Sequence, residues 1–123
     1  MDTVLWVATA GLALVFASSG VAKSTMSRER LLATGQSGIA PFPMPVVRLV
    51  AWCELAAVVG LIAPWLSGTA TWLTPLASCG LALVMWGAAV SHASLREPAQ
   101  VAANVGILVV CLAVAAGRLA QLS

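Results

Sequence analysis

The chain has 123 residues, of which 61% are hydrophobic and only 8% are charged, and its formal net charge is +2. Because a soluble domain carries about a quarter charged residues, this composition argues against a soluble enzyme and against a disordered tail. The six basic residues are too few to follow a phosphate backbone, so we expect no nucleic-acid partner.

Four apolar stretches predict helices that cross the lipid bilayer, because each is long enough for a hydrocarbon core of about 30 Å. They cover residues 3–22, 45–63, 70–93 and 99–119. Short connections after the second and third stretches favour antiparallel neighbours. The predicted fold is therefore all-α, an up-down four-helix bundle that forms a single transmembrane domain over residues 1–123.

The first stretch ends at Lys23 and is expected to remain in the protein as a membrane helix. A cleaved signal peptide carries basic residues near its start, where this chain has Asp2. The long connection 24–44 follows. Its first part, 24–34, predicts a short interfacial helix with apolar side chains toward lipid and charged ones toward water.

The second part of this connection is rich in proline. Pro41, Pro43 and Pro45 surround Phe42, which excludes an α-helix here and favours an extended path. Such a stiff apolar segment is either a lid over an opening of the bundle or a tether between two helices. The tether is the simpler interpretation.

Glu54 is the most informative residue of the second stretch. It lies nine residues beyond Pro45, or about 14 Å into its helix, near the bilayer centre. A charge facing lipid at that depth costs at least about 2.5 kcal/mol. Glu54 is therefore expected to point into the bundle and to be protonated or paired. Its role is either functional or only a hydrogen bond that holds helices together.

The third stretch places Trp86 about level with Glu54 and His92 close to the membrane boundary. The depth difference between Glu54 and His92 is about 11 Å along the bilayer normal, so no direct pair of these two side chains is expected. His92 is closer in depth to Arg48 and Lys23, and it is expected to reach Glu54 only through water or a ligand.

The fourth stretch carries a polar stripe. At 100° per residue its members fall within about 60° of arc, so they are expected to face the bundle interior or a watery crevice. They are Gln100, Asn104, Cys111 and Arg118. Arg118 lies near the helix end, where we expect its guanidinium to extend toward water.

The distribution of basic residues predicts the orientation of the bundle. Most of them lie in the first and third connections or beside them, namely Lys23, Arg28, Arg30, Arg48 and Arg96. By the positive-inside rule, these connections face the cytoplasm and both termini face outward. Three tryptophans near the outward end are interpreted as interfacial anchors, namely Trp6, Trp65 and Trp72.

The polar residues collect in the half of the membrane that we assign to the cytoplasmic side. They are Ser19, Lys23, Arg48, Glu54, His92, Gln100 and Asn104. This asymmetry predicts a cavity that opens inward, with Glu54 as its floor and Trp52 and Trp86 as its walls. Three single cysteines and one histidine do not make a dithiol or metal site, so no metal is expected.

Several of these residues together resemble the DoxX-like family of small four-helix bacterial membrane proteins. The first helix ends in Phe16-x-x-x-Gly20-x-x-Lys23, and the later parts of the resemblance are Glu54 with Gly60-Leu61, Gly87-Ala88 to His92, Asn104 and Gly117-Arg118. The resemblance implies that Lys23, Glu54, His92 and Asn104 are the family's polar positions. It also implies a bacterial inner membrane, and association with quinone-linked oxidation of sulfur compounds and with redox-stress complexes.

Three functions remain open at this point. In the first interpretation, the chain binds a lipophilic small molecule, with a quinone as the candidate cofactor. It then serves as the membrane subunit of a redox complex with a soluble partner. Alternatively, it is an isomerase, cyclase or epoxide hydrolase in which Glu54 transfers a proton while His92 and Asn104 orient or relay. In the third interpretation the polar residues only hold a scaffold together. A homodimer is as compatible with the sequence as a monomer.

Overall fold

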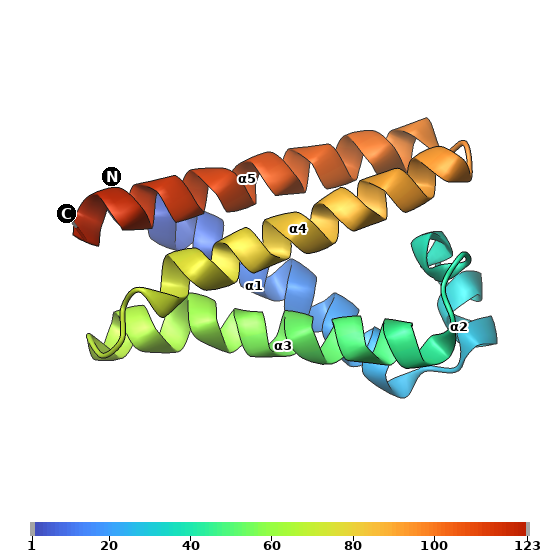
Figure 1. The fold of residues 1–123 in the computed structure, drawn as a ribbon, viewed down its shortest axis with the longest axis horizontal. Helices are drawn as coiled ribbons and strands as arrows, with labels where there is room; N and C mark the ends of the chain where they lie inside the picture. Colours follow the sequence, from blue (N-terminus) through green and yellow to red (C-terminus); the bar gives the residue numbers. More distant parts are fainter. Residues whose placement is uncertain (1, 123) are drawn as a thin grey trace.

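The computed structural model describes residues 2–122, and this part of the chain is helical without strands (Figure 1). Four helices are long and apolar enough to cross a membrane: α1 (Asp2–Thr25), α3 (Met44–Ser67), α4 (Leu73–Ser94) and α5 (Pro98–Leu122). Two short elements lie between α1 and α3, namely α2 (Arg28–Ala33) and the 3-10 turn η1 (Ser37–Ile39). The predicted all-α class with four membrane-length helices is confirmed.

The long helices pack as two pairs that are joined at one end. Helix α1 packs on α3, α4 packs on α5, and α3 joins the pairs through α4. The common core takes side chains from every long helix, and Phe16, Leu61, Leu81 and Val114 are among them. Toward the end that carries α2, the α1–α3 pair and the α4–α5 pair diverge, whereas both termini lie at the other end (Figure 1).

Helix α3 does not end before Pro64, as the sequence pattern predicts, but continues to Ser67. A proline inside a helix has no N–H, which leaves the carbonyl of the residue four positions earlier without its partner. Here that carbonyl belongs to Gly60, and it accepts a hydrogen bond of 2.9 Å from the hydroxyl of the buried Thr74 on α4. The neighbouring helix therefore supplies the missing donor, which removes the main reason for α3 to stop.

The connection between α1 and α3 also departs from its predicted course. The expected interfacial helix over 24–34 is divided, because α1 runs to Thr25 and α2 begins after Ser27, whose hydroxyl accepts the N-cap hydrogen bond from Arg30 N. The proline-rich part is not extended throughout, since η1 precedes Pro41. A small core of Leu31, Ile39 and Val47 fixes the connection onto α3.

Candidate functional site

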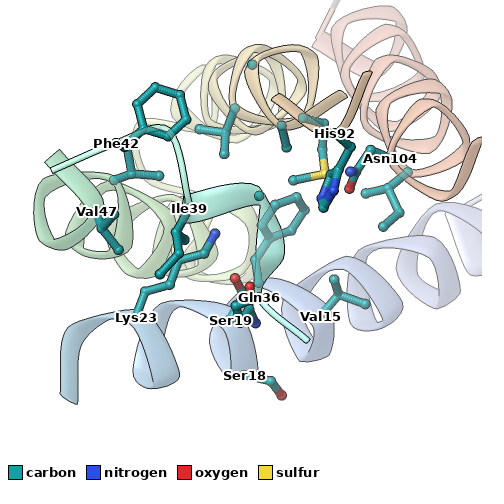
Figure 2. A pocket seen from close by; sticks show the side chains of 18 of the residues that line it. Val15, Ser18, Ser19, Lys23, Gln36, Ile39, Phe42, Val47, His92 and Asn104 are labelled. Carbon is teal, nitrogen blue, oxygen red and sulfur yellow. The ribbon is translucent and has the colours of Figure 1, made fainter. Parts of the chain in front are cut away.

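A cavity of about 550 Å³ lies between the two diverging helix pairs, and the segment 35–42 covers one of its sides. Most of its walls are aliphatic or aromatic. Six residues with polar side chains also line it, namely Ser18, Ser19, Lys23, Gln36, His92 and Asn104. Figure 2 shows Ser19, Lys23 and Gln36 on one side of the cavity and His92 and Asn104 on the other. An apolar hollow with a few convergent polar groups is the usual form of a small-molecule site.

The cavity reaches the outer surface of the bundle between the helix pairs. Its lining includes Val15 and Ser18 of α1 and Leu83 and Gly87 of α4, all of which are exposed. These positions lie within helices that are apolar enough to span a membrane, so the openings face hydrocarbon. A guest in this cavity therefore has direct access from the lipid phase.

Lys23 and Glu54 form an ion pair beside the cavity. The distance from Nζ to Oε1 is 2.9 Å, and the carboxylate side chain is fully buried whereas the lysine side chain is 13% exposed. Glu54 points inward, as expected, and its partner comes from α1. Glu54 does not line the cavity, so the expectation that it forms the floor is wrong; Lys23 is the member of the pair that lines the cavity. The second carboxylate oxygen, Oε2, has no hydrogen-bond partner.

The close approach of α1 and α3 explains why this pair forms. A Cβ atom on Gly20 would lie 3.1 Å from the carbonyl oxygen of Ala51, so only glycine fits there without displacement. Lys23 and Glu54 each follow one of these small residues by about one helical turn, on the same face. The sequence therefore contains a signal for the pair. Each of the two small residues is followed three positions later by a charged residue, and the two charges are opposite.

His92 has a different partner, which the sequence analysis did not identify. Its Nδ1 lies 2.8 Å from Oε1 of Glu97, and the same oxygen accepts a 2.9 Å hydrogen bond from the hydroxyl of Ser37. The turn after α4 makes this contact possible. Arg96 takes a left-handed conformation with φ of 59°, and Glu97 N donates to His92 O. A left-handed residue with such a hydrogen bond is a common way for a helix to end, and it turns the chain back toward the last turn of α4.

The pKa of Glu97 is lowered from its ordinary value of 4.5, first by the hydrogen bond with His92 and then by the one from Ser37. Glu97 lies in the connection between α4 and α5, outside both membrane-length helices. Because its folded pKa is depressed, its contribution to stability is present above pH 4.5 and is lost as the pH falls through the lowered value. At neutral pH the side chain is therefore a carboxylate.

The segment 35–42 is fixed over the cavity by hydrogen bonds to its backbone. Ser91 donates to the carbonyl of Gly38 at 2.6 Å, and Arg28 donates to the carbonyls of Ala40 and Phe42 at 2.6 and 2.7 Å. A Cβ atom on Gly38 would lie 2.9 Å from Nε2 of His92, so glycine lets the segment approach the imidazole ring. The segment tethers two helices and also covers the cavity.

Several expected site residues do not line the cavity. Trp52 and Trp86 are 61% and 62% exposed and point away from the bundle interior, so the prediction that they form the cavity walls is wrong. Gln100 is also exposed. Arg48 donates a 2.6 Å hydrogen bond to the carbonyl of Lys23 and so fixes the end of α1 onto α3. Its role here is structural.

The expectation that Arg118 extends toward water is also wrong. Its side chain is fully buried, and its guanidinium carbon lies 4.8 Å from the ring centre of Trp6 and 4.5 Å from that of Trp65. Nη1 donates to Asp2 at 2.8 Å and to Gln121 at 2.7 Å. Two of the three supposed interfacial anchors are therefore cation–π partners. Only Trp72 of the three is exposed.

Comparison with known protein families identifies the family of the chain. The model of the DoxX-like family matches residues 7–114. The chain belongs to the DoxX-like family. No curated protein and no solved structure matches it. Ser19, Lys23, Gln36, His92 and Asn104 all fall inside the matched range, whereas Asp2, Trp6 and Arg118 of this DoxX-like protein fall outside it.

The geometry gives a physical role to the first-helix residues on which the family resemblance rests. Phe16 fills the common core, Gly20 permits the close approach of α1 and α3, and Lys23 completes the ion pair. In residues 2–122 no cluster of three metal-ligating side chains is present.

Proposed function

We propose that this DoxX-like protein binds a lipophilic small molecule, with a quinone as the candidate, inside the membrane. The observation that carries the proposal is the cavity of about 550 Å³, with mostly apolar walls and six residues that bring polar side chains. Lys23 supplies N–H donors, and Asn104 supplies both a donor and an acceptor. A molecule with an apolar body and one or two oxygen atoms matches this lining, and the lateral openings leave room for a hydrocarbon tail.

Bulk added at the lateral opening tests the proposal. A Cβ atom on Gly87 meets nothing within 4 Å, and Gly87 lines the cavity. Gly87→Trp is expected to reduce the amount of co-purified lipophilic molecule roughly tenfold or more, since overpacking typically costs 1–3 kcal/mol. The measurement is mass spectrometry of solvent extracts from the purified protein.

Two controls accompany this variant. Gly80→Trp adds the same bulk to the same helix at an equally open position that does not line the cavity, and Trp52→Ala changes a tryptophan that faces lipid. Both are expected to retain the molecule. An unmodified protein that carries no lipophilic molecule, or equal loss in Gly80→Trp and Gly87→Trp, contradicts the proposal.

An intramembrane acid–base enzyme that acts on a lipid-soluble substrate is the second candidate. The observation that favours it is the carboxylate-paired imidazole of His92 at the cavity wall. Glu54 is less suited to proton transfer to a guest, because its carboxylate is bonded to Lys23 and does not line the cavity. Conversion of the co-purified molecule by the purified protein supports this candidate, and recovery of the unchanged molecule favours binding alone.

We also propose that the protein lies in the bacterial inner membrane with both termini outside. Its basic end then lies in the cytoplasm, where it is available to a soluble redox partner. Arg30 lies at that end, and Thr69 lies in the connection between α3 and α4 at the opposite end; both are exposed. In a chain with its cysteines replaced by alanine, a membrane-impermeant maleimide is expected to label Thr69→Cys in intact cells. Arg30→Cys is expected to react only after permeabilisation, and the reverse pattern contradicts this orientation.

A further inference from the structure

The imidazole ring of His92 has one nitrogen in use and one that is free. Nδ1 contacts the carboxylate of Glu97 at 2.8 Å, and Nε2 has no hydrogen-bond partner among residues 2–122. His92 lines the cavity, and so does Gly38, the residue against which Nε2 packs. Nε2 is therefore the ring nitrogen that remains for a bound molecule.

The hydrogen-bond partner of Nδ1 determines whether Nε2 donates or accepts a hydrogen bond. An ionised carboxylate has no proton to donate, so the proton in the His92–Glu97 hydrogen bond belongs to Nδ1. Glu97 is ionised at neutral pH, because its hydrogen bonds with His92 and Ser37 lower its pKa. In a neutral imidazole with its proton on Nδ1, Nε2 is a hydrogen-bond acceptor.

In the part of the chain that the structure describes, no group donates a hydrogen bond to Nε2. The ring packs against the backbone of Gly38, and the hydroxyl of Ser91 donates to the Gly38 carbonyl instead. The hydroxyl of Ser37 is bonded to Glu97. An acceptor at the wall of an apolar cavity is satisfied when the guest itself brings the proton.

We propose that the cavity selects lipid-soluble alcohols or phenols, whose hydroxyl donates to Nε2 of His92, and that Glu97 is the positioning residue that sets this preference. The inference rests on the proposed function, since it names the class of molecule that occupies the same cavity. For the quinone candidate it means the reduced hydroquinone, which carries phenolic hydroxyls, whereas the quinone itself offers only carbonyl acceptors. It assigns a role to Glu97, which lies between α4 and α5 and does not itself line the cavity.

A matched pair of probes tests the inference. The probes are 2-naphthol and 2-methoxynaphthalene, which have the same ring system and differ in the hydroxyl proton. Binding is measured at neutral pH by equilibrium dialysis against lipid nanodiscs that contain the protein, with empty nanodiscs as the blank. The unmodified protein is expected to bind 2-naphthol roughly tenfold more tightly, as one additional hydrogen bond implies.

Glu97→Gln is expected to reduce this ratio toward one, because a side-chain amide donates to Nδ1 as readily as it accepts and so no longer fixes the proton there. If the role of Glu97 were only structural, Glu97→Gln would weaken the binding of both probes equally and leave the ratio of their affinities unchanged. Glu29→Gln makes the same chemical change at an exposed position outside the cavity, and it is expected to retain the tenfold ratio. His92→Phe keeps a ring but removes both nitrogens, so its ratio is also expected to approach one.

The outcomes separate the two proposals. If neither probe binds the unmodified protein above the blank, the proposed function fails together with the inference. If both probes bind with equal affinity, or if Glu97→Gln and His92→Phe keep the tenfold ratio, the inference is overturned while the proposed function stands.

Discussion

Glu54→Leu is expected to lower the free energy of unfolding by about 3–5 kcal/mol, because it leaves the ammonium of Lys23 without its carboxylate inside an apolar bundle. Lys23→Met is expected to cost a similar amount, since it leaves the fully buried carboxylate of Glu54 without a cation. The measurement is thermal unfolding in detergent, followed by circular dichroism.

The double variant Glu54→Leu/Lys23→Met is the decisive control. Replacing a whole buried ion pair with apolar side chains of similar volume is often neutral or stabilising, so the double variant is expected to be as stable as the unmodified protein or more stable. A double variant whose loss of stability equals the sum of the two single losses would show that the side chains act separately. Because Lys23 lines the cavity, a stable double variant that no longer carries a lipophilic molecule would assign Lys23 to binding.

Arg118→Ala is expected to cost about 2–5 kcal/mol for a different reason, namely the loss of packed volume. The Arg118 side chain is fully buried between the rings of Trp6 and Trp65. Its polar partners do not depend on it in the same way, because the side chain of Asp2 is 61% exposed and Gln121 is also exposed. Removal of the guanidinium therefore leaves a gap between two indoles and no buried, unpaired carboxylate.

Arg118→Met separates volume from charge. Methionine keeps an unbranched side chain between the indoles, and it removes two buried nitrogen atoms, Nε and Nη2, that have no hydrogen-bond partner. We expect its stability to lie within about 1 kcal/mol of the unmodified protein, because cation–π contacts of about 0.5–2 kcal/mol are offset by the relieved desolvation. If Arg118→Met is as damaging as Arg118→Ala, the charge is the stabilising property. The same unfolding assay measures both variants.

The spans were predictable from the sequence because the bilayer sets their length, and residues 45–63 are correctly placed inside α3. The end of α3 was not predictable from Pro64 alone. Its continuation depends on the hydroxyl of Thr74, a residue on another helix. The contact between Glu97 and His92 was also not predictable from the sequence, because it depends on the left-handed conformation of Arg96.

The faces of the helices were harder to predict than their positions. In water, an apolar stripe marks the buried face of a helix, but in lipid both faces are apolar. Trp52 and Trp86 were therefore assigned to the interior when they face outward. Polar residues report burial more reliably in this setting, since Glu54, Thr74 and Ser78 are all fully buried. Arg118 shows the limit, because its partners on α1 and α3 are distant in sequence.

The contacts of this bundle differ widely in the number of residues that separate the two partners along the chain. Thr74 bonds to a carbonyl 14 residues earlier, and Lys23 and Glu54 are separated by 31 residues. Arg118 and Asp2 are separated by 116 residues. Since a ribosome makes the chain from the N-terminus, the first two contacts become available while α5 is still unmade. The indole clamp around the guanidinium is therefore a late step of biogenesis, reached only after the last helix has entered the bilayer.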